Sequence, residues 1–394
     1  MAFLEQRLRF MHKDHEVFSF YVDLQENALR FGKPLKHFEE APYGMLELGA
    51  DLDALLWKFF FPRCIPAERN GYEKILEATG YSSGFALSFA GHGLSLSNHY
   101  WFLRDDEDLS YKDINFFEHP FDDSFGRALL NEDYEALRTC DLNVPDIVTP
   151  GYASKGWLCE DGPKLYKLGI DPTHCEEAIG EALASSLAKR LFGEEGALGY
   201  ELKRWKDTYA SVCAPLASMN EELVPLSSVL PLSLREMVRD PAKRSFDDSF
   251  FTKLSEAGFP ALKEQFVKLS CLRSLSFISD LHFGNLALLK NLEDGSLRPA
   301  PFYDLAGAFG GSKRGKALLS NLNEGTLFLV YFLFGGLDPK WDYSWYDPKR
   351  LEGFEEEMRL ELGKSEFYTP ELIENIVRVY ARQKEALDDL AKKR

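Results

Sequence analysis

The sequence predicts an α+β protein, and three observations along the chain lead to this expectation. The first ~125 residues mix alternating apolar patterns, which are typical of strands, with a helical pattern. The middle reads as strand, helix and strand, and helical patterns dominate from Ser233 onward. The chain has 394 residues, enough for two or three domains. We therefore expect domains at residues 1–125, 126–230 and 231–394.

The N-terminal region alternates strand and helix signals. Residues 16–24, EVFSFYVDL, and residues 93–103, GLSLSNHYWFL, alternate as strands do, whereas residues 50–61, ADLDALLWKFFF, have helical spacing. Residues 104–126 are acidic and aromatic with little periodicity, so we expect an irregular connector packed by its aromatic rings. The acidic run at residues 105–108 lacks the alternating ligands and the glycine of a calcium loop, which predicts a solvated turn.

The middle of the chain predicts a hairpin strand, a helix and a second strand. Residues 144–158 are rich in turn formers, and residues 160–169, EDGPKLYKLG, indicate an Asp-Gly turn followed by a strand. Residues 175–193, CEEAIGEALASSLAKRLFG, place apolar side chains on one helical face and end at a glycine. Residues 208–216, TYASVCAPL, predict another strand, and a final helix is expected at residues 370–394.

Charge and cysteine content exclude several classes of partner. The formal net charge is −17, which argues against a broad nucleic-acid footprint and against binding to an anionic membrane surface. The six cysteines form no C-x-x-C pair, so we expect reduced thiols in a cytoplasmic protein. The N-terminus has no apolar signal core, and the longest apolar run, residues 326–334, is roughly half the length that crosses a bilayer.

Three polar side chains stand in an otherwise apolar run, SFISDLHFGNLALL, at residues 276–289. Asp280, His282 and Asn285 follow the spacing D-x-H-x-x-N, and offsets of two and five do not share one helical face. The segment that follows, LALLKNLEDGSLRPAPFYD, reads as a β-hairpin with Asp-Gly at its turn. Because a hairpin brings its two ends together, we expect Asn285 and Asp304 to lie side by side.

This set of residues predicts phosphoryl transfer. One amide oxygen and one carboxylate oxygen, with water and phosphate completing the shell, suit Mg²⁺. Asp280, a short distance away, can accept the proton of an attacking hydroxyl. A catalytic aspartate, an asparagine five residues on and a second aspartate after a hairpin form the arrangement used by protein-kinase-like enzymes. We therefore expect ATP and Mg²⁺ as cofactors.

The segments FISDLHFGNLALL and LRPAPFYDLAG resemble the signature of the HipA-like kinases, which are bacterial members of the protein-kinase-like superfamily. The resemblance covers roughly residues 145–394, and the residues before it are similar to the N-terminal part of a Gram-positive and phage branch of these proteins. It implies a bilobal protein-kinase-like fold, with a small β-rich lobe and a larger, mainly helical lobe. A small α/β N-terminal domain would precede these lobes.

The resemblance implies a catalytic or metal-binding role for five matching residues. Lys167, in GPKLYKLG, would contact the α- and β-phosphates, and Glu181, in GEALASSLAKRLFG, would hold that lysine. Asp280 would orient or deprotonate the acceptor hydroxyl, while Asn285 and Asp304 would bind Mg²⁺.

The same resemblance implies the remaining contacts of the nucleotide. The loop TPGYASKGWL, which contains Gly151 and Gly156, would cover the phosphates. The backbone of Val212, Cys213 and Ala214 would meet the adenine as a hinge between the lobes.

The sequence departs from the family pattern at several places. FIS stands where the family commonly has a turn with Asn or Gly, and the phosphate-covering loop has only two glycines. Lys164 lies three residues before Lys167, so alternation places it on the opposite strand face, and the apolar flanks favour Lys167. His282 is expected to be structural and to bond backbone near the metal carboxylate.

A competing phosphate motif lies at residues 310–317, GGSKRGKA, which nearly match a P-loop. Ala317 stands where the metal-binding hydroxyl belongs, and the preceding DLAGAF is a poor strand. The other readings are that Lys313 and Arg314 meet a substrate or a phosphorylated residue, or that the loop is solvated and mobile.

Three functions follow as hypotheses. The leading one is a kinase whose partners are ATP, a protein with an acceptor Ser or Thr, and a regulatory protein. The second is a nucleotide-binding pseudokinase, or interaction module, that does not transfer phosphate. The third is a metal-dependent hydrolase built on Asp280, His282 and Asp304, which would need a further set of ligands that the sequence does not indicate.

Overall fold

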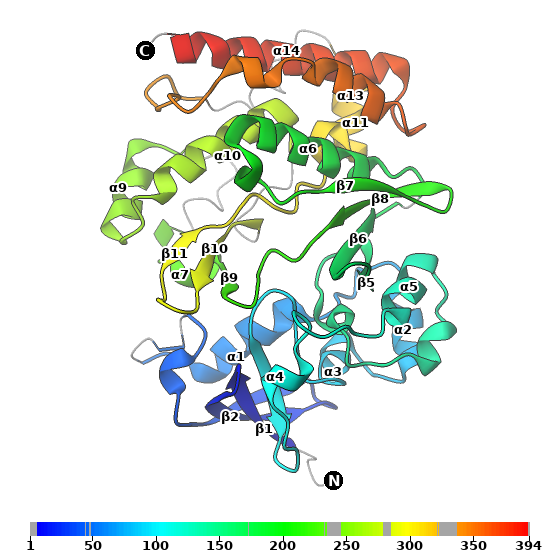
Figure 1. The fold of residues 1–394 in the computed structure, drawn as a ribbon, viewed down its shortest axis with the longest axis vertical. Coiled ribbons are helices and arrows are strands. Elements are labelled where there is room, and N and C mark those ends of the chain that lie inside the picture. The colour runs from blue at the N-terminus through cyan, green and yellow to red at the C-terminus, as the bar shows by residue number, and fades with distance from the viewer. Residues whose placement is uncertain are drawn as a thin grey trace. The chain divides into compact units, whose positions relative to one another are not determined.

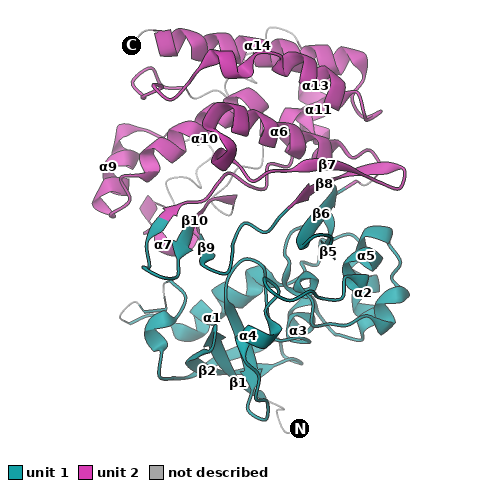
Figure 2. Cartoon of the chain, viewed as in Figure 1, with its two compact units in different colours: residues 1–170, 214–224, 289–297 teal, residues 171–213, 225–288, 298–394 magenta. Residues whose placement is uncertain are grey.

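The structure is a computed structural model that describes residues 6–43, 45–46, 49–171, 173–231, 233–234, 246–278, 285–320, 322 and 337–392. The chain divides into two compact units (Figure 2). Unit 1 comprises residues 1–170, 214–224 and 289–297, and unit 2 comprises residues 171–213, 225–288 and 298–394. The chain is built of strands and helices (Figure 1), and both kinds of element occur in each unit (Figure 2), which confirms the predicted α+β class. The domain boundaries expected near residues 125 and 230 stay predictions.

Unit 1 begins with a four-stranded antiparallel sheet of order β3-β2-β1-β4. The strands of its continuous N-terminal part are β1 (Gln6–His12), β2 (His15–Asp23), β3 (Ala28–Pro34), β4 (Tyr100–Arg104), β5 (Ser154–Cys159) and β6 (Pro163–Gly169). Its helices are α1 (Leu52–Phe60), α2 (Tyr72–Thr79), α3 (Gly84–Ser88), α4 (Tyr111–Ile114) and α5 (Ser124–Asn131).

The first sheet buries an aromatic core. Phe10 of β1 lies opposite Phe18 of β2 in the register, and their rings stack with centroids 4.4 Å apart. Burying an aromatic side chain of this size stabilises a fold by about 1.5–3 kcal/mol, and the stacked pair adds to this. Helix α1 packs on β3 and is capped at its N-terminus by Asp51, whose carboxylate accepts the Ala54 N–H. The strand expected at residues 16–24 and the helix expected at residues 50–61 are therefore confirmed.

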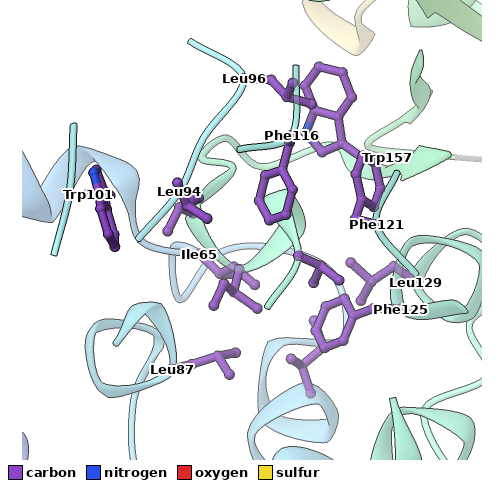
Figure 3. Close-up of a cluster of buried hydrophobic side chains, with 14 of the residues drawn as sticks. Ile65, Leu87, Leu94, Leu96, Trp101, Phe116, Phe121, Phe125, Leu129 and Trp157 are labelled. Atoms are coloured by element: carbon purple, nitrogen blue, oxygen red, sulfur yellow. The ribbon is translucent and has the colours of Figure 1, made fainter. Parts of the chain in front are cut away.

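A second apolar cluster gathers the side chains of the expected connector (Figure 3). Phe116, Phe121 and Phe125 are buried there together with Trp157 of β5. The connector is thus packed by its aromatic rings as predicted, although α4 and the start of α5 form within it. The strand expected at residues 93–103 is wrong in its first half, because its buried leucines enter this cluster instead of pairing in the sheet.

Strands β5 and β6 form an antiparallel hairpin in unit 1. Its turn has Asp161 at φ 48° and Gly162 at φ 96°, so both residues adopt the left-handed region that favours glycine and aspartate. The hairpin turn and the strand expected at residues 160–169 are confirmed. The sequence prediction assigned turns to residues 144–158, whereas the second half of that segment is β5.

The described residues of unit 2 include the β7–β8 hairpin and most of the long helices. The hairpin strands are β7 (Glu201–Trp205) and β8 (Thr208–Cys213). The helices are α6 (Glu176–Phe192), α7 (Leu226–Val229), α9 (Asp248–Glu256), α10 (Leu262–Ser276), α11 (Lys313–Ser320), α13 (Phe354–Leu362) and α14 (Pro370–Lys392). Helix α6 packs on α10 and α13, and α14 packs on α10, α11 and α13.

The predicted helices of unit 2 are present. Helix α6 ends at Gly193, which has φ 89°, and α14 begins at Pro370 as expected. The strand predicted at residues 208–216 is β8, but its partner β7 was not predicted. None of the described helices has the length and apolar composition needed to span a membrane.

A third sheet, of order β11-β10-β9, consists of β9 (Glu221–Pro225), β10 (Ala287–Asn291) and β11 (Leu297–Pro299). Strands β10 and β11 are the two arms of the hairpin predicted after the D-x-H-x-x-N motif. The Asn291 N–H donates to the Ser296 carbonyl at 2.9 Å, and Gly295 turns the chain with φ 73°. The expected hairpin is therefore confirmed.

Candidate functional site

The segment that carries the first two motif residues lies outside the described residues. Asp280 and His282 fall in residues 279–284, so their predicted roles stay predictions. Helix α10 leads into this segment and ends at Phe277, whose φ of 56° turns the chain out of the helix. Phe277 and Ile278, the last described residues before it, are both buried.

The third motif residue lies beside the second aspartate. Asn285 is buried, and its Nδ2 donates to the backbone carbonyl of Asp304 at 3.3 Å, although the two residues are 19 positions apart in sequence. The hairpin between them brings about this contact, because the Ala300 N–H donates to the Ala287 carbonyl at 3.0 Å. The expectation that Asn285 and Asp304 lie side by side is confirmed. Their proposed function as metal ligands is a separate question.

Asp304 has an unusual backbone that is fixed from both sides. Its φ is 54°, in the left-handed region that aspartate tolerates better than most non-glycine residues. The Asp304 N–H donates to the Tyr200 hydroxyl at 3.1 Å, and the Asp304 carbonyl accepts from Asn285. Two side chains thus stabilise a conformation that costs of order 1–3 kcal/mol. Strain of this kind is concentrated at functional sites.

Tyr200 was not predicted from the sequence, yet it links Asp304 to helix α6. Burial raises the pKa of Tyr200 well above its usual value, and the negative charges of Glu181, Cys213 and Asp304 raise it further. Two carboxylates, those of Glu181 and Asp304, therefore act on the same phenol. No sequence motif marks Tyr200, since GALGYEL contains no pattern that would single it out.

Glu181 is a buried carboxylate of unit 2. It is 1% exposed on α6, and its Oε2 accepts the Ser211 hydroxyl of β8 at 2.5 Å. The residue before it, Gly180, allows α6 to approach the segment after Asp304, because a Cβ at Gly180 would lie 2.7 Å from the Ala308 carbonyl oxygen. The sequence thus places a glycine where the helix and this segment must pass closely.

Helix α6 also positions the chain around Tyr200. The Ser185 hydroxyl donates to the Leu198 carbonyl at 2.7 Å and accepts the Tyr200 N–H at 3.1 Å. The Leu198 N–H in turn donates to the Phe302 carbonyl at 2.8 Å. Residues 198–200 are thereby attached both to α6 and to the segment that ends at Asp304. Glu181, Asn285 and Asp304 are consequently held within one connected part of unit 2.

Lys167 belongs to unit 1 and is described within that unit. It is 6% exposed on β6 and lies opposite Lys155 of β5 in the register, so the two lysines share one face of the hairpin. Lys164 pairs with Leu158 instead and is only half-buried. Which of the two lysines would contact a nucleotide stays a prediction. Lys155 was missed, because a single lysine in a turn-rich segment carries no distinguishing pattern.

The two glycines expected in a phosphate-covering loop have different surroundings. Gly151 lies in the loop and has φ 100°, and the Lys155 ammonium donates to the neighbouring Pro150 carbonyl at 2.8 Å. Gly156 lies on β5, where a Cβ would meet the Gly126 carbonyl oxygen at 2.4 Å. Gly156 is thus required for the close packing of β5 on α5, and a contact of either glycine with phosphate stays a prediction.

The expected adenine hinge follows β8. Val212 and Cys213 are buried at the end of this strand, whereas Ala214 is exposed. Their predicted role in nucleotide binding is not tested by these positions.

The P-loop alternative is not supported. A P-loop follows a buried strand, but residues 303–307 form no strand and lead into a 3₁₀ turn at Ala308–Gly310. Lys313 and Arg314 lie in the first turn of α11, and the Lys316 ammonium lies over the Phe367 ring, 4.2 Å from its centroid.

Comparison with known proteins gives two structural likenesses. No family model matches the sequence, and no curated protein matches it. The structure is similar to a chain of the HipA–HipB toxin–antitoxin complex with operator DNA from Shewanella oneidensis MR-1. That match has a TM-score of 0.49 and 12% identity and covers 98% of this chain and 99% of that chain.

The second likeness is to the proinflammatory kinase CtkA of Helicobacter pylori, with a TM-score of 0.40 and 13% identity. It covers 61% of this chain and 93% of that chain. Likenesses at these TM-scores and identities do not assign an activity, so function is argued from this chain's own residues.

Proposed function

We propose that the protein is an ATP- and Mg²⁺-dependent phosphotransferase that transfers the γ-phosphoryl group of ATP to a hydroxyl, with a serine or threonine of a protein as acceptor. The observation that carries the proposal is the contact between Asn285 and Asp304 at the two ends of one hairpin. The asparagine of a D-x-H-x-x-N motif and an aspartate after the next hairpin are the metal ligands that protein-kinase-like phosphoryl transfer uses.

The chemistry of the two ligands fits Mg²⁺. This ion prefers oxygen ligands, and in phosphoryl-transfer sites one or two protein groups hold it together with water and substrate phosphates. Asn285 donates through Nδ2, so Oδ1 is the atom of the same amide that would coordinate the ion. Asp304 would supply a carboxylate oxygen. When bound, Mg²⁺ would neutralise charge on the β- and γ-phosphates.

The backbone contacts of Asp304 support this assignment. A metal ligand has to keep one orientation, and hydrogen bonds at both its N–H and its carbonyl restrict rotation of the Asp304 backbone. The left-handed φ of Asp304 comes before a turn in which Gly307, Phe309 and Gly310 also have positive φ. A fixed and strained aspartate next to an amide is expected of a ligand.

Asp280, Lys167 and Glu181 complete the proposal. The acceptor oxygen would form a bond to the γ-phosphorus while the bond to the β–γ bridging oxygen breaks, which releases ADP, and Asp280 would take the acceptor's proton. Lys167 would bind the α- and β-phosphates, and Glu181 would orient that lysine. The burial of Lys167 and Glu181 in their own units is compatible with these roles.

The experiment is transfer of label from radiolabelled ATP in the presence of Mg²⁺, read first as autophosphorylation and ATP turnover. Asp280→Ala is expected to abolish transfer. Asp304→Asn is expected to lower the rate at least about 100-fold, because a neutral amide would hold Mg²⁺ less well and the charge of the reacting phosphates would be neutralised less. Asn285→Ala is expected to act in the same direction.

A matched control is available on the same hairpin. Asp294 lies at its turn, where its carboxylate accepts the Ser296 N–H at 2.8 Å, and Asp294→Asn is expected to leave transfer unchanged. Equal activity of Asp304→Asn and the wild type would contradict the metal assignment. Calorimetric binding of ATP with no turnover would favour the nucleotide-binding regulatory module instead.

A further inference from the structure

A cluster of histidines and glutamates in unit 1 plays no part in the proposed phosphotransferase. His12 and His15 flank the turn between β1 and β2 and form the last pair of its register, so their side chains leave the hairpin close together. His37 joins them because its N–H donates to the Glu16 carbonyl at 3.0 Å, which continues the pairing along β2. Glu40 follows one turn later.

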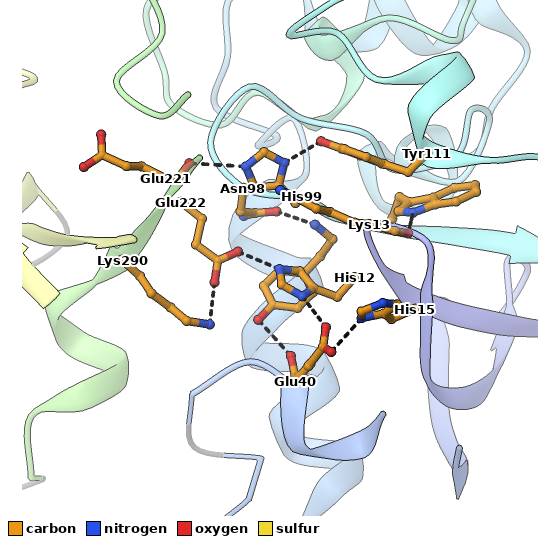
Figure 4. Close-up of polar contacts among 12 residues, drawn as sticks. His12, Lys13, His15, Glu40, Asn98, His99, Tyr111, Glu221, Glu222 and Lys290 are labelled. Carbon is orange, nitrogen blue, oxygen red and sulfur yellow. Dashed lines mark hydrogen bonds and ion pairs between the residues drawn. The ribbon is translucent and has the colours of Figure 1, made fainter. Parts of the chain in front are cut away.

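Three imidazoles lie around the Glu40 carboxylate, and the Nδ1 of His37 also lies 3.4 Å from Oε1 of Glu39. The Nδ1 of His15 lies 2.7 Å from Oε1 of Glu40, and the Nδ1 of His37 lies 3.7 Å from the same oxygen. The Nδ1 of His12 lies 2.7 Å from the other oxygen, Oε2. Figure 4 shows His12 and His15 directed at Glu40. The Glu40 backbone is fixed as well, because its carbonyl accepts the Tyr100 hydroxyl at 3.0 Å.

The cluster has an outer set of contacts that would orient a ligand. The Nε2 of His12 lies 3.1 Å from Oε2 of Glu222, whose Oε1 accepts the Lys290 ammonium at 3.1 Å (Figure 4). His12 and Glu222 are buried, whereas the side chain of His15 is 53% exposed. The arrangement is therefore a buried hydrogen-bonded support beneath groups that solvent can reach.

We propose that His15, His37 and Glu40 form a binding site for a divalent transition-metal ion of the Zn²⁺ class. Two imidazole nitrogens and one carboxylate oxygen are a recognised set of three zinc ligands that leaves a fourth position open for water or a substrate group. The three ligand atoms lie within 4.8 Å of one another. The His15 and His37 rings stack with centroids 4.3 Å apart, so both imidazoles are on the same side of the carboxylate.

Binding would require small side-chain movements and no change in the backbone. Zinc bonds of about 2.0–2.2 Å to each ligand bring the ligand atoms closer to one another than 4.8 Å. His15 and His37 have the exposure to make this movement, with side chains 53% and 26% exposed. His12 would keep its contact with Oε2 of Glu40 and would act as a positioning residue. A group that orients a ligating carboxylate changes the affinity of the site for the metal.

The test uses the full chain after treatment with a chelator. Zn²⁺ is titrated by calorimetry, and Co²⁺ is then used as a spectroscopic probe, since its visible absorption reports a tetrahedral site. We expect one Zn²⁺ per chain at this cluster and a rise in thermal stability on binding. The double variant His15→Ala, His37→Ala is expected to lose this equivalent and the Co²⁺ signal. His12→Gln is expected to weaken binding about 10–100-fold.

The exposed His119, whose ring bonds the Lys112 carbonyl elsewhere in unit 1, supplies the control. His119→Ala is expected to bind Zn²⁺ as the wild type does. The proposal is overturned if the wild type takes up no Zn²⁺. It is also overturned if uptake is the same in the double variant, because the cysteines would then account for the binding. Kinase activity plays no part in either outcome.

Discussion

Glu222 and Asp146 are both buried in unit 1, yet their pKa values move in opposite directions. Each residue is 1% exposed. The pKa of Glu222 lies below the ordinary value of a glutamate, whereas the pKa of Asp146 rises to about 7. Burial alone raises the pKa of a carboxyl, since it disfavours the charged form. The difference therefore has to come from the partners.

The two carboxylates differ in how completely they are paired. Burial opposes the charge of Glu222, but the hydrogen bond from His12 and the charge of Lys290 outweigh it. Asp146 accepts the Trp157 N–H through Oδ1 at 2.8 Å, and its Oδ2 has no hydrogen-bond partner among the described residues. Burial is the main cause of its raised pKa, which the charge of Arg69 lowers only in part.

The incompletely paired carboxylate lies next to the predicted phosphate-covering loop. Arg69 donates to the carbonyls of Thr149 and Gly151, so the same guanidinium that faces Asp146 also holds this loop. The fully paired carboxylate lies beneath the histidine cluster instead. Two buried acids of one unit are thus suited to different tasks: Glu222 stays ionised as a support, and Asp146 changes charge near neutral pH.

The largest expected effect comes from removing the fully paired carboxylate. Glu222→Ala would leave His12 and Lys290 without the charge they surround, and loss of one partner of a buried pair costs about 3 kcal/mol. The free energy of unfolding in urea measures the effect. If Glu222→Ala were as stable as the wild type, the inference that the pairing of Glu222 stabilises the fold would be wrong.

An exposed ion pair supplies the control for this prediction. Glu16 pairs with Arg9 at 2.5 Å, and the Glu16 side chain is 40% exposed. Solvent screens such pairs, so Glu16→Ala is expected to cost less than about 1 kcal/mol. Comparison of the two variants separates burial from the mere presence of an ion pair.

A smaller effect concerns the pH dependence that Asp146 contributes. Its pKa is raised in the folded state, so its contribution to stability is full at low pH and is lost as the pH rises through about 7. Between about pH 5.5 and pH 8, the free energy of unfolding of the wild type is expected to fall by about 2 kcal/mol relative to that of Asp146→Asn. The neutral amide of the variant does not titrate. Parallel stability profiles of the two proteins would show that Asp146 is already ionised at the lower pH.

The sequence alone could predict structure that depends on residues close to one another in the chain. Local patterns located the hairpin of β5 and β6, the helix α6 and the contact between Asn285 and Asp304. In each case residues near in sequence determine the geometry, through a turn, a helical face or the return of a hairpin. The two hairpin turns are examples. Gly162 and Gly295 adopt the left-handed region that these turns require, so an Asp-Gly pair in the sequence predicts the turn.

Contacts between distant segments could not be predicted. Glu222 meets His12 across more than 200 residues, and Tyr200 meets Asp304 across about half that distance in sequence. Such pairs depend on which strands and helices pack together, and a single sequence does not specify this. Strand β5 was not predicted for a related reason. Gly156 permits its close packing on α5, but in the sequence alone a glycine indicates a turn.

The smallest expected effect concerns Asp304, whose backbone, unlike the side chains of Glu222 and Asp146, receives the stabilising contact. Tyr200→Phe removes the hydroxyl that accepts the Asp304 N–H, and a buried backbone donor that loses its partner costs about 1 kcal/mol. Tyr209→Phe is the matched control, because it removes the same atom from a tyrosine of β8 whose ring faces the Lys364 ammonium. If Asp304 depends on this hydrogen bond, Tyr200→Phe should also lower phosphate transfer several-fold, with the Mg²⁺ requirement shifted to higher concentration. Unchanged Mg²⁺ dependence would mean that the hairpin and Asn285 alone orient Asp304.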